Sequence, residues 1–207
     1  MEVIVVADIT ERDSGADIIN RLYEIDPILF DEHQLSSGAL SPIYVDLKKI
    51  ISFPCLLDDL AQDLVVMMLD LEMDVILGVP RAAERIAILV SNKTDIPMIA
   101  YREKAKEYGT RKKIEGVYQE GQVCLLIEDV VTTAASVLRA AYSLEREGLK
   151  VRDILSIVDR EEGGRENIEK AGYNPHSMFK VTQLLDCYLQ GGRIAQDQYD
   201  YIVRSRQ

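Results

Sequence analysis

The sequence predicts an α/β fold in which a mostly parallel central sheet is flanked by helices. Three short apolar runs, each suited to a buried strand, carry this prediction: Val75–Leu77, Val123–Ile127 and Ile154–Val158. Each run is followed by a stretch with helical periodicity, and such alternation is typical of a parallel sheet covered on both faces. Ligands bind to such sheets beyond the carboxyl ends of the strands. We therefore expect a functional site in the loops that follow these three runs.

The segment before the first apolar run contributes four predicted elements. Pro27 ends the first helix, because the residue before a proline is pushed out of helical geometry, and Pro54 suits the first turn of the second helix. The elements are a strand or arm over Val3–Val6, a helix from about Ser14 to Ile25, a strand over Ile43–Leu47 and a helix from Pro54 through Met68.

The remaining predicted elements alternate with the apolar runs and complete one domain over residues 1–207. They are a helix over Arg81–Val90, a strand over Pro97–Tyr101, and helices over Ser136–Glu147 and near Arg165–Ala171. The sequence has no internal repeat, low-complexity tract or linker that would divide it. The core is therefore expected over about residues 54–185.

The composition is that of a globular protein and excludes several classes. Of 207 residues, 47% are hydrophobic and 29% charged, and the roughly 18 consecutive apolar residues of a membrane span are missing. The amino terminus does not resemble a signal peptide. Three cysteines in apolar surroundings indicate reduced thiols in a cytoplasmic protein, and two histidines are too few for a histidine-based metal centre.

Charge is unevenly distributed along the chain. The net charge of −11 argues against binding to nucleic acid or to an anionic membrane surface. The segment Arg102–Lys113 nevertheless carries six basic and two acidic residues, a local charge of +4, which leaves −15 for the remainder. A basic island in an acidic protein is a candidate site for a small polyanion. The alternative is a solvated charged segment, the commonest fate of such runs.

The turn after the second apolar run is the most informative stretch. Two carboxylates, Glu128 and Asp129, follow the buried strand, and hydroxyl-bearing and small residues then begin a helix. The free N–H groups at a helix N-terminus suit a phosphate, to which Thr132, Thr133 and Ser136 add hydroxyl donors. The carboxylates can accept hydrogen bonds from sugar hydroxyls or hold magnesium through water. A helix start of this composition without any ligand is the alternative.

This turn resembles the phosphoribosyl-pyrophosphate (PRPP) signature of type I phosphoribosyltransferases. Further segments, in order across about residues 20–165, are similar to those of orotate phosphoribosyltransferases. They are a substrate-binding segment at Leu35–Gly38 and Ser41–Leu47, a pyrophosphate loop at Gly78–Pro80, a catalytic loop over Arg102–Thr110 and the segment of the orotate-binding arginine at Asp159–Gly164. The chain most resembles the phosphoribosyltransferase half of bifunctional uridine monophosphate (UMP) synthases.

The resemblance implies a type I phosphoribosyltransferase fold with a small N-terminal hood over about residues 14–50. The implied reaction converts orotate and PRPP into orotidine 5′-monophosphate and pyrophosphate with Mg²⁺, for pyrimidine biosynthesis, in a cytoplasmic homodimer. Lys106 and Asp129 are the implied catalytic residues, with Mg²⁺ carried by PRPP near Glu128 and Asp129. The implied PRPP contacts are Arg102, Lys106, Glu128, Asp129, Thr132, Thr133, Ala134, Ala135 and Ser136, and the implied orotate contacts are Ser36, Tyr44 and Arg160.

The chain departs from the family pattern at four places implied to contact ligands. Ser36 stands where the family has a lysine. In the catalytic loop the family has a lysine directly after the arginine, and Glu103 occupies that position here. Ala134 and Ala135 replace glycine or other small residues, and alanine tolerates a positive φ poorly. The fourth departure is Arg81–Arg85, which replaces an aromatic, small residues, a leucine and a proline after the pyrophosphate loop.

Three hypotheses follow from this pattern. The first is an active orotate phosphoribosyltransferase, and the second is a weakened or inactive relative that serves as a regulatory or assembly domain. The third is a phosphoribosyltransferase for another base. Arg160 and the segment Ser41–Leu47 favour orotate over purines, whereas the substitutions at Ser36, Glu103 and Ala134-Ala135 favour the second hypothesis over the first.

Overall fold

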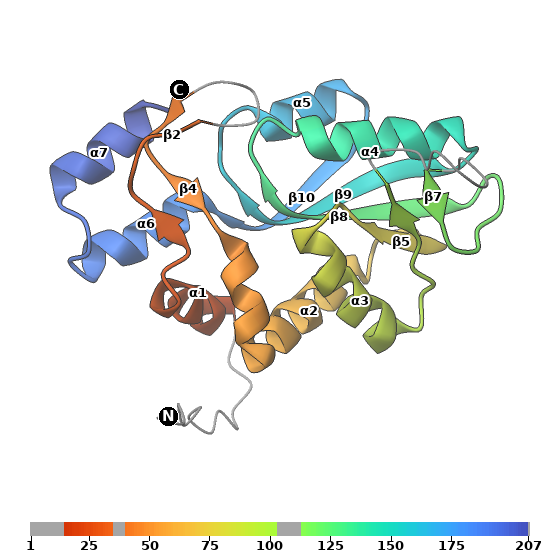
Figure 1. Ribbon diagram of the computed structural model, residues 1–207, viewed down its shortest axis with the longest axis horizontal. Coiled ribbons are helices and arrows are strands. Elements are labelled where there is room, and N and C mark those ends of the chain that lie inside the picture. Colours follow the sequence, from red (N-terminus) through yellow and green to blue (C-terminus); the bar gives the residue numbers. More distant parts are fainter. Residues whose placement is uncertain (1–14, 35–39, 103–112, 207) are drawn as a thin grey trace.

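A four-stranded parallel sheet forms the centre of the computed structural model, which describes residues 15–34, 40–102 and 113–206 (Figure 1). The strand order is β10-β9-β8-β5, and all three neighbouring pairs are parallel. The strands are β5 (Val75–Gly78), β8 (Val123–Val131), β9 (Lys150–Asp159) and β10 (Asn174–Lys180). The predicted fold class is confirmed. The strand or arm predicted over Val3–Val6 lies outside the described residues.

Helices cover both faces of the sheet, and the strands supply a core to each. Side chains alternate between the two faces of a strand. Leu125 and Ile127 of β8 therefore belong to one buried cluster, and Cys124 and Leu126 to the other. The first cluster packs against α1 (Gly15–Glu24), α2 (Pro54–Met68), α3 (Ala82–Thr94) and α6 (Val181–Gln190), and the second against α4 (Ala135–Arg146) and α5 (Gly164–Lys170) (Figure 1).

Most helices begin and end close to their predicted positions. The helix α2 has the bounds predicted from Pro54, and α1 ends at Glu24, one residue before the predicted end. The helix α3 runs past its predicted end at Val90 to Thr94. No helix in the described ranges is long and apolar enough to cross a membrane.

Two predicted strands are too short and two are too long. The strand β8 continues past its predicted end at Ile127 to Val131, and β9 begins at Lys150, before its predicted start at Ile154. Of the strand predicted over Ile43–Leu47, β4 keeps Tyr44–Val45, and Leu47 begins the 3-10 helix η1 (Leu47–Ser52). The Asp46 side chain accepts a hydrogen bond from the Lys48 backbone N–H at 3.2 Å, which favours the helical turn over an extended chain.

The strand predicted over Pro97–Tyr101 shortens to β6 (Ala100–Tyr101). It pairs antiparallel with β7 (Ile114–Glu115), and an isolated parallel bridge between Ile76 and Met98 joins this part of the chain to β5. The pair β6–β7 stands at the two ends of residues 103–112, which are not described.

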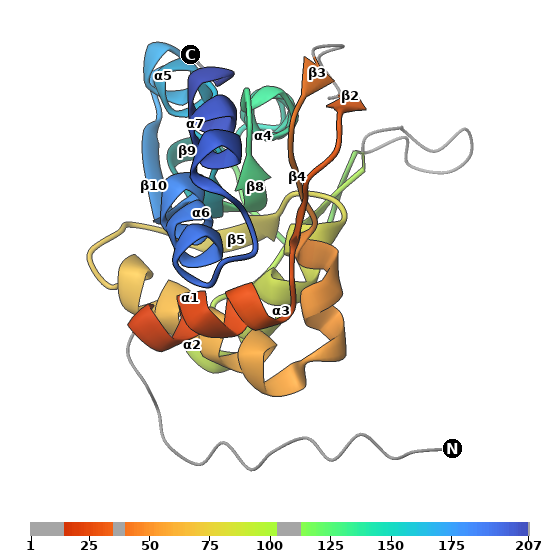
Figure 2. The same cartoon turned by 90° about the vertical axis from the view of Figure 1, so that its left-hand side faces the viewer.

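The residues between α1 and η1 form a small hood of two antiparallel ladders. The strand β1 (Ile28–Leu29) pairs with β4, and β2 (His33–Gln34) pairs with β3 (Leu40–Ser41). Figure 2 shows β2, β3 and β4 as a narrow projection beside the sheet. The hood thus corresponds to the substrate segment expected over about residues 14–50.

The C-terminal elements were not predicted. The strand β10 is an edge strand with one neighbour, β9, and most of its side chains are only half-buried, so it shows no apolar run. It leads into α6, which packs against α1, and then into α7 (Gln196–Arg204), whose Ile202 is buried in the same core.

Candidate active site

The loops after β5, β8 and β9 meet at one cavity, as expected from the sequence. The register pairs Gly78 with Ile127 and Val131 with Asp159, so the carboxyl ends of these strands lie along one edge of the sheet. The cavity has a volume of about 300 Å³. It is lined by Tyr44, Val45, Asp46, Lys48, Pro80, Arg81, Ala82, Asp129, Val130, Thr132, Thr133, Ser136 and Arg160.

The two neighbouring carboxylates, Glu128 and Asp129, lie in the last part of β8, which continues past the predicted strand end at Ile127, and they occupy different places. Asp129 is half-buried and lines the cavity. Glu128 is buried and is not among the lining residues; its carboxylate accepts hydrogen bonds from the Ser136 hydroxyl at 3.0 Å and from the Asp129 N–H at 3.1 Å. Burial, followed by the charge of Asp129, raises the pKa of Glu128 well above its ordinary value. Asp129 is therefore the carboxylate available to a ligand, and Glu128 supports the turn from beneath.

The turn from β8 into α4 presents an uncapped helix N-terminus to the cavity. Thr132, Thr133 and Ser136 line it. Among the described residues no side chain caps the helix at Ala134, so the first-turn N–H groups of α4 have no side-chain acceptor from that part of the chain. Ala134 has a φ of +64°, in the left-handed region, and its methyl group is buried in the core. Neither Ala134 nor Ala135 is among the described residues that line the cavity.

The start of α5 braces this turn from the other side. A Cβ atom on Gly164 would lie 2.4 Å from the Thr132 carbonyl oxygen, so the close approach of the two backbones requires glycine. The side-chain amide of Asn167 donates a hydrogen bond to the Thr133 carbonyl at 3.1 Å. The turn from β8 into α4 is thus held by backbone packing on a neighbouring helix.

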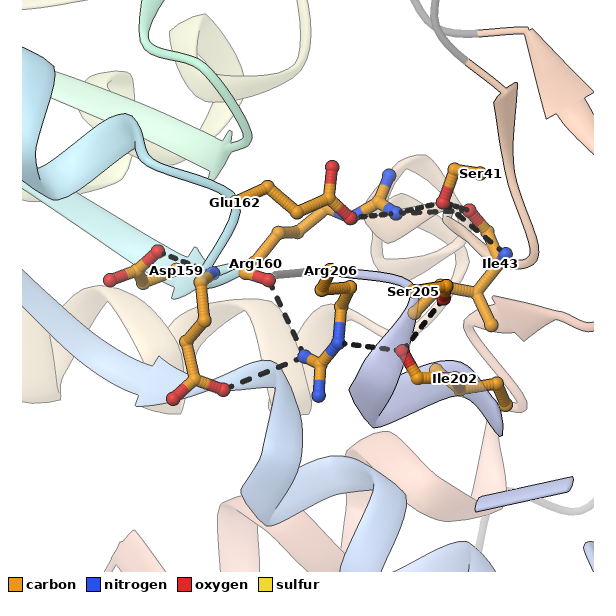
Figure 3. Close-up of polar contacts among 9 residues, drawn as sticks. Ser41, Ile43, Asp159, Arg160, Glu162, Ile202, Ser205 and Arg206 are labelled. Atoms are coloured by element: carbon orange, nitrogen blue, oxygen red, sulfur yellow. Dashed lines mark hydrogen bonds and ion pairs between the residues drawn. The ribbon is translucent and has the colours of Figure 1, made fainter. Parts of the chain in front are cut away.

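Arg160, directly after β9, joins the sheet to the hood (Figure 3). Its side chain is 2% exposed, and its Nη2 donates to the Ser41 hydroxyl at 2.7 Å, the Ile43 carbonyl at 3.0 Å and the Glu162 carboxylate at 2.7 Å. Burial lowers the pKa of the guanidinium, and the charge of Glu162 opposes that change. The Nε–H of Arg160 is buried and has no partner among the described residues.

Tyr44 brings the second predicted orotate contact to the same cavity. It lies on β4 of the hood, and its hydroxyl accepts a hydrogen bond from Lys48 Nζ at 3.0 Å. This hydrogen bond is the largest cause of a raised Lys48 pKa. Lys48 is therefore a cation at the cavity.

A second cavity of about 770 Å³ adjoins the first and is strongly basic. The two cavities share the residues Lys48, Pro80, Arg81 and Ala82. Its further lining residues are Glu84, Arg85, Tyr101 and Arg102. Arg81 and Arg85 make no ion pair within the described ranges. Arg102 lines this cavity and not the first one, and its guanidinium pairs with Glu115 at 2.9 Å.

The segment Arg81–Arg85, which departs from the family pattern, brings two cations to the wall of the second cavity: Arg81 precedes α3, and Arg85 lies on it. The sequence could have indicated this pair of cations, because Arg81 and Arg85 are four residues apart at the start of a predicted helix and therefore share one face of it. Two other predicted site residues, Ser36 and Lys106, lie outside the described residues, as does Glu103.

Known proteins are similar to this chain in sequence and in fold, although no family model matches it. The chain is 35% identical over 189 residues to the orotate phosphoribosyltransferase of Caenorhabditis elegans, covering 90% of this chain and 83% of that protein. It is 39% identical over 175 residues to the uridine 5′-monophosphate synthase of Bos taurus, covering 84% of this chain. The UMP synthase structure of Leishmania donovani superimposes with a TM-score of 0.85 at 28% identity, covering 94% of this chain.

The length of the match differs between these relatives. The chain spans 36% of the bovine synthase and 42% of the Leishmania chain, but most of the C. elegans transferase. The similarity therefore concerns the part that all three share. By its sequence and its fold, the chain belongs to the orotate phosphoribosyltransferase family.

Proposed function

We propose that this chain transfers the phosphoribosyl group of PRPP to orotate, giving orotidine 5′-monophosphate and pyrophosphate in pyrimidine biosynthesis. One observation carries the proposal: an uncapped helix N-terminus, the carboxylate of Asp129 and the guanidinium of Arg160 surround a single cavity. These groups match, in turn, a sugar phosphate, the ribose hydroxyls and an anionic base. An inactive relative would not need all three.

The PRPP end of the cavity follows from the turn after β8. The 5-phosphate would accept hydrogen bonds from the first-turn N–H groups of α4 and from the hydroxyls of Thr132 and Thr133. Asp129 would accept hydrogen bonds from the ribose hydroxyls. Breaking the bond at the anomeric carbon develops positive charge on the sugar, and a nearby carboxylate stabilises that charge. Catalysis would thus rest on positioning and electrostatics.

The orotate end of the cavity would be formed by Arg160 and Tyr44. Orotate is an anion, and a guanidinium with unused donor capacity suits its carboxylate. The unpartnered Nε–H of Arg160 supports this assignment, because buried donors in proteins nearly always have an acceptor. Arg160 also contacts the hood, so base binding would be coupled to the position of the hood.

The second cavity would receive the diphosphate. Lys48, Arg81 and Arg85 offer positive charge beside the PRPP end, in a chain whose net charge is −11. Such a cluster attracts a polyanion and neutralises the leaving group. In this proposal it makes up in part for the cations missing at Ser36 and Glu103, while Lys106 and Arg102 act from the catalytic loop that the resemblance implies.

Mg²⁺ is proposed as the cofactor, carried by the diphosphate. Within the described ranges no group of three or more His, Cys, Asp or Glu side chains could hold a metal. Mg²⁺ in phosphoryl sites commonly takes one or two carboxylates together with substrate oxygens, and Asp129 fits this requirement. When bound, the ion would neutralise charge on the departing diphosphate.

A homodimer in the cytoplasm is proposed for the working protein. Ile51 and Phe53, at the end of η1, are 51% and 43% exposed and offer apolar surface to a second copy. All three cysteines are unpaired, which is usual in a reducing compartment. Sedimentation velocity would test the assembly; a purely monomeric protein at micromolar concentration would contradict it.

The activity test is direct. Purified protein is mixed with orotate, PRPP and Mg²⁺, and the loss of orotate absorbance is followed while PRPP binding is measured by calorimetry. We expect turnover that requires all three components. Absence of both turnover and PRPP binding would refute the proposal, and binding without turnover would support the regulatory alternative.

A further inference from the structure

The C-terminal tail returns to the turn that carries Arg160. After α7 the chain places the side chain of Arg206 against this turn, where it is only 4% exposed (Figure 3). Its Nη1 donates to the Arg160 carbonyl at 3.4 Å and lies 3.6 Å from the Glu161 carboxylate. Its Nε donates to the Ile202 carbonyl at 3.2 Å, which ties the same guanidinium to α7. A buried arginine near the end of the chain thus bridges α7 and the orotate-binding turn.

Other contacts besides those of Arg206 hold the Arg160–Glu161 turn. The Arg160 N–H donates to the Val131 carbonyl at 2.9 Å, so its backbone is tied to β8 on one side and to Arg206 on the other. Glu161 adopts a left-handed φ of +55°, and its carboxylate also accepts the Thr182 N–H at 3.2 Å. A non-glycine residue in this region is strained, so it needs surrounding contacts to hold it.

Charge adds to this geometry. Glu162 accepts a hydrogen bond from Arg160, and little of either side chain is exposed to solvent. Burial raises the pKa of Glu162, while the charges of Arg160 and Arg206 oppose the rise. Arg206 therefore helps to keep Glu162 an anion that can orient the Arg160 guanidinium toward the hood.

We propose that Arg206 is a positioning residue for base binding: it holds the Arg160–Glu161 backbone so that the guanidinium of Arg160 stays aimed at the hood and the cavity. The proposal rests on the proposed function for the identity of the base, and on the contacts of Arg206 alone for the brace itself. It assigns a role to the C-terminal tail, which neither the sequence nor the family resemblance explained.

The test compares three variants of the full chain. Arg206→Ala removes the brace, and Arg206→Lys keeps the charge but not the planar fork of donors. Arg204→Ala is the matched control, because Arg204 lies two residues away, is 79% exposed and pairs only with Asp200, at 3.6 Å, within the described ranges. Initial rates are measured with orotate varied at saturating PRPP and with PRPP varied at saturating orotate. Hydrogen exchange of the peptide over residues 159–163 is measured in parallel.

For Arg206→Ala we expect the KM for orotate to rise about tenfold, as for loss of a charged hydrogen-bonding partner, with a change of less than about twofold in the KM for PRPP. Arg206→Lys should recover part of this loss, and Arg204→Ala should match the parent protein. Exchange over residues 159–163 should quicken in Arg206→Ala alone. If Arg206→Ala folds poorly, Arg206→Lys tests the proposal instead: its KM for orotate should rise more than its KM for PRPP.

Two results would overturn the proposal. One is an unchanged KM for orotate together with unchanged exchange, and the other is an equal rise of both KM values in every Arg206 variant. If the parent protein does not turn over orotate, the proposed function fails, but the exchange measurement still confirms or refutes the brace.

Discussion

The two ends of the cavity, the proposed phosphate end and the proposed base end, are held in place by different means. The phosphate end belongs to β8, which pairs with a strand on each side and is covered by helices on both faces. The base end belongs to the hood, whose two ladders have two residue pairs each and which Arg160 joins to the sheet through Ser41 and Ile43. Backbone hydrogen bonding therefore positions the phosphate end, whereas a few buried side-chain contacts position the base end. Substitutions at the two ends should fail in different ways.

Asp129→Asn should have the largest effect on activity, because it removes the cavity carboxylate placed beside the developing positive charge. We expect kcat to fall by about 100-fold or more, the size usual for loss of one electrostatic stabiliser. Thermal stability should hardly change, since the neighbouring strand pairing is untouched. The control is Asp70→Asn, an exposed aspartate after α2. A kcat within threefold of the parent would show that Asp129 is not catalytic.

Gly164→Ala should have the largest effect on stability. The new methyl group would meet the Thr132 carbonyl and a Val131 methyl group, both 2.4 Å away, so α5 or the phosphate turn must shift. Overpacking of this kind costs about 1–3 kcal/mol. Gly163→Ala is the matched variant: its Cβ would meet no atom within 4 Å, and only its left-handed φ of +81° is strained, at about 1 kcal/mol.

Urea unfolding with both glycine variants separates the two costs. The KM for PRPP should rise in Gly164→Ala and stay near the parent value in Gly163→Ala. Equal losses of stability in the two variants would mean that the close packing at Gly164 costs no more than the backbone strain at Gly163.

The same difference between the two ends explains what could be predicted from the sequence. The strand of the phosphate end is indicated by the apolar run Val123–Ile127, and its turn by the hydroxyl-bearing residues that follow. The adjacent carboxylates, predicted in the turn, lie in the last part of the strand. Such patterns are local, so one segment is enough to find them. At the base end, Ser41 and Arg160 are 119 residues apart and meet only in the folded chain. The family resemblance assigned Arg160, and the neighbouring Glu162 was a local candidate partner, but no local pattern indicated the contacts with Ser41 and Ile43.

Two other features escaped prediction for related reasons. The strand β10 lies at a sheet edge and is only half-buried, so burial imposes no apolar alternation on it. Arg206 follows a polar helix, and its contact with the Arg160 carbonyl joins residues that are 46 positions apart in the sequence. In both cases the determining neighbours are distant in sequence, and only the fold brings them together.

Ser41→Ala should weaken the base end specifically. It removes the 2.7 Å hydrogen bond between the Ser41 hydroxyl and Arg160, while the Ile43 carbonyl and Glu162 remain. Loss of one hydrogen bond to a charged group costs about 1.5 kcal/mol, so the KM for orotate should rise about tenfold with little change for PRPP. Ser52→Ala, at an exposed serine, is the control. A rise confined to the KM for PRPP would contradict the division of the cavity into two ends.

Glu128→Gln should make stability less dependent on pH. The folded state holds the pKa of Glu128 above the ordinary value of 4.5, mainly through burial. A group with a raised carboxyl pKa stabilises the fold below that ordinary value and loses this contribution as pH rises through the folded pKa. Glutamine stays neutral, so the variant should gain in Tm over the parent at pH 8 and lose that advantage toward pH 5. The exposed Glu120→Gln should show no such trend, and a gain that grows as pH falls would contradict the assignment.

Ala134→Gly should have the smallest effect on stability and on PRPP binding, because its contributions to stability oppose one another. Glycine relieves a left-handed φ of +64°, worth about 1–2 kcal/mol, but it frees the unfolded chain by about 0.4–1 kcal/mol and removes a buried methyl worth about 0.8 kcal/mol. These contributions nearly cancel, so the urea midpoint should move little. The Ala134 methyl packs in the core and not at the cavity, so the KM for PRPP should stay within about twofold. A large gain in PRPP affinity would instead show that this departure from the family pattern obstructs the phosphate.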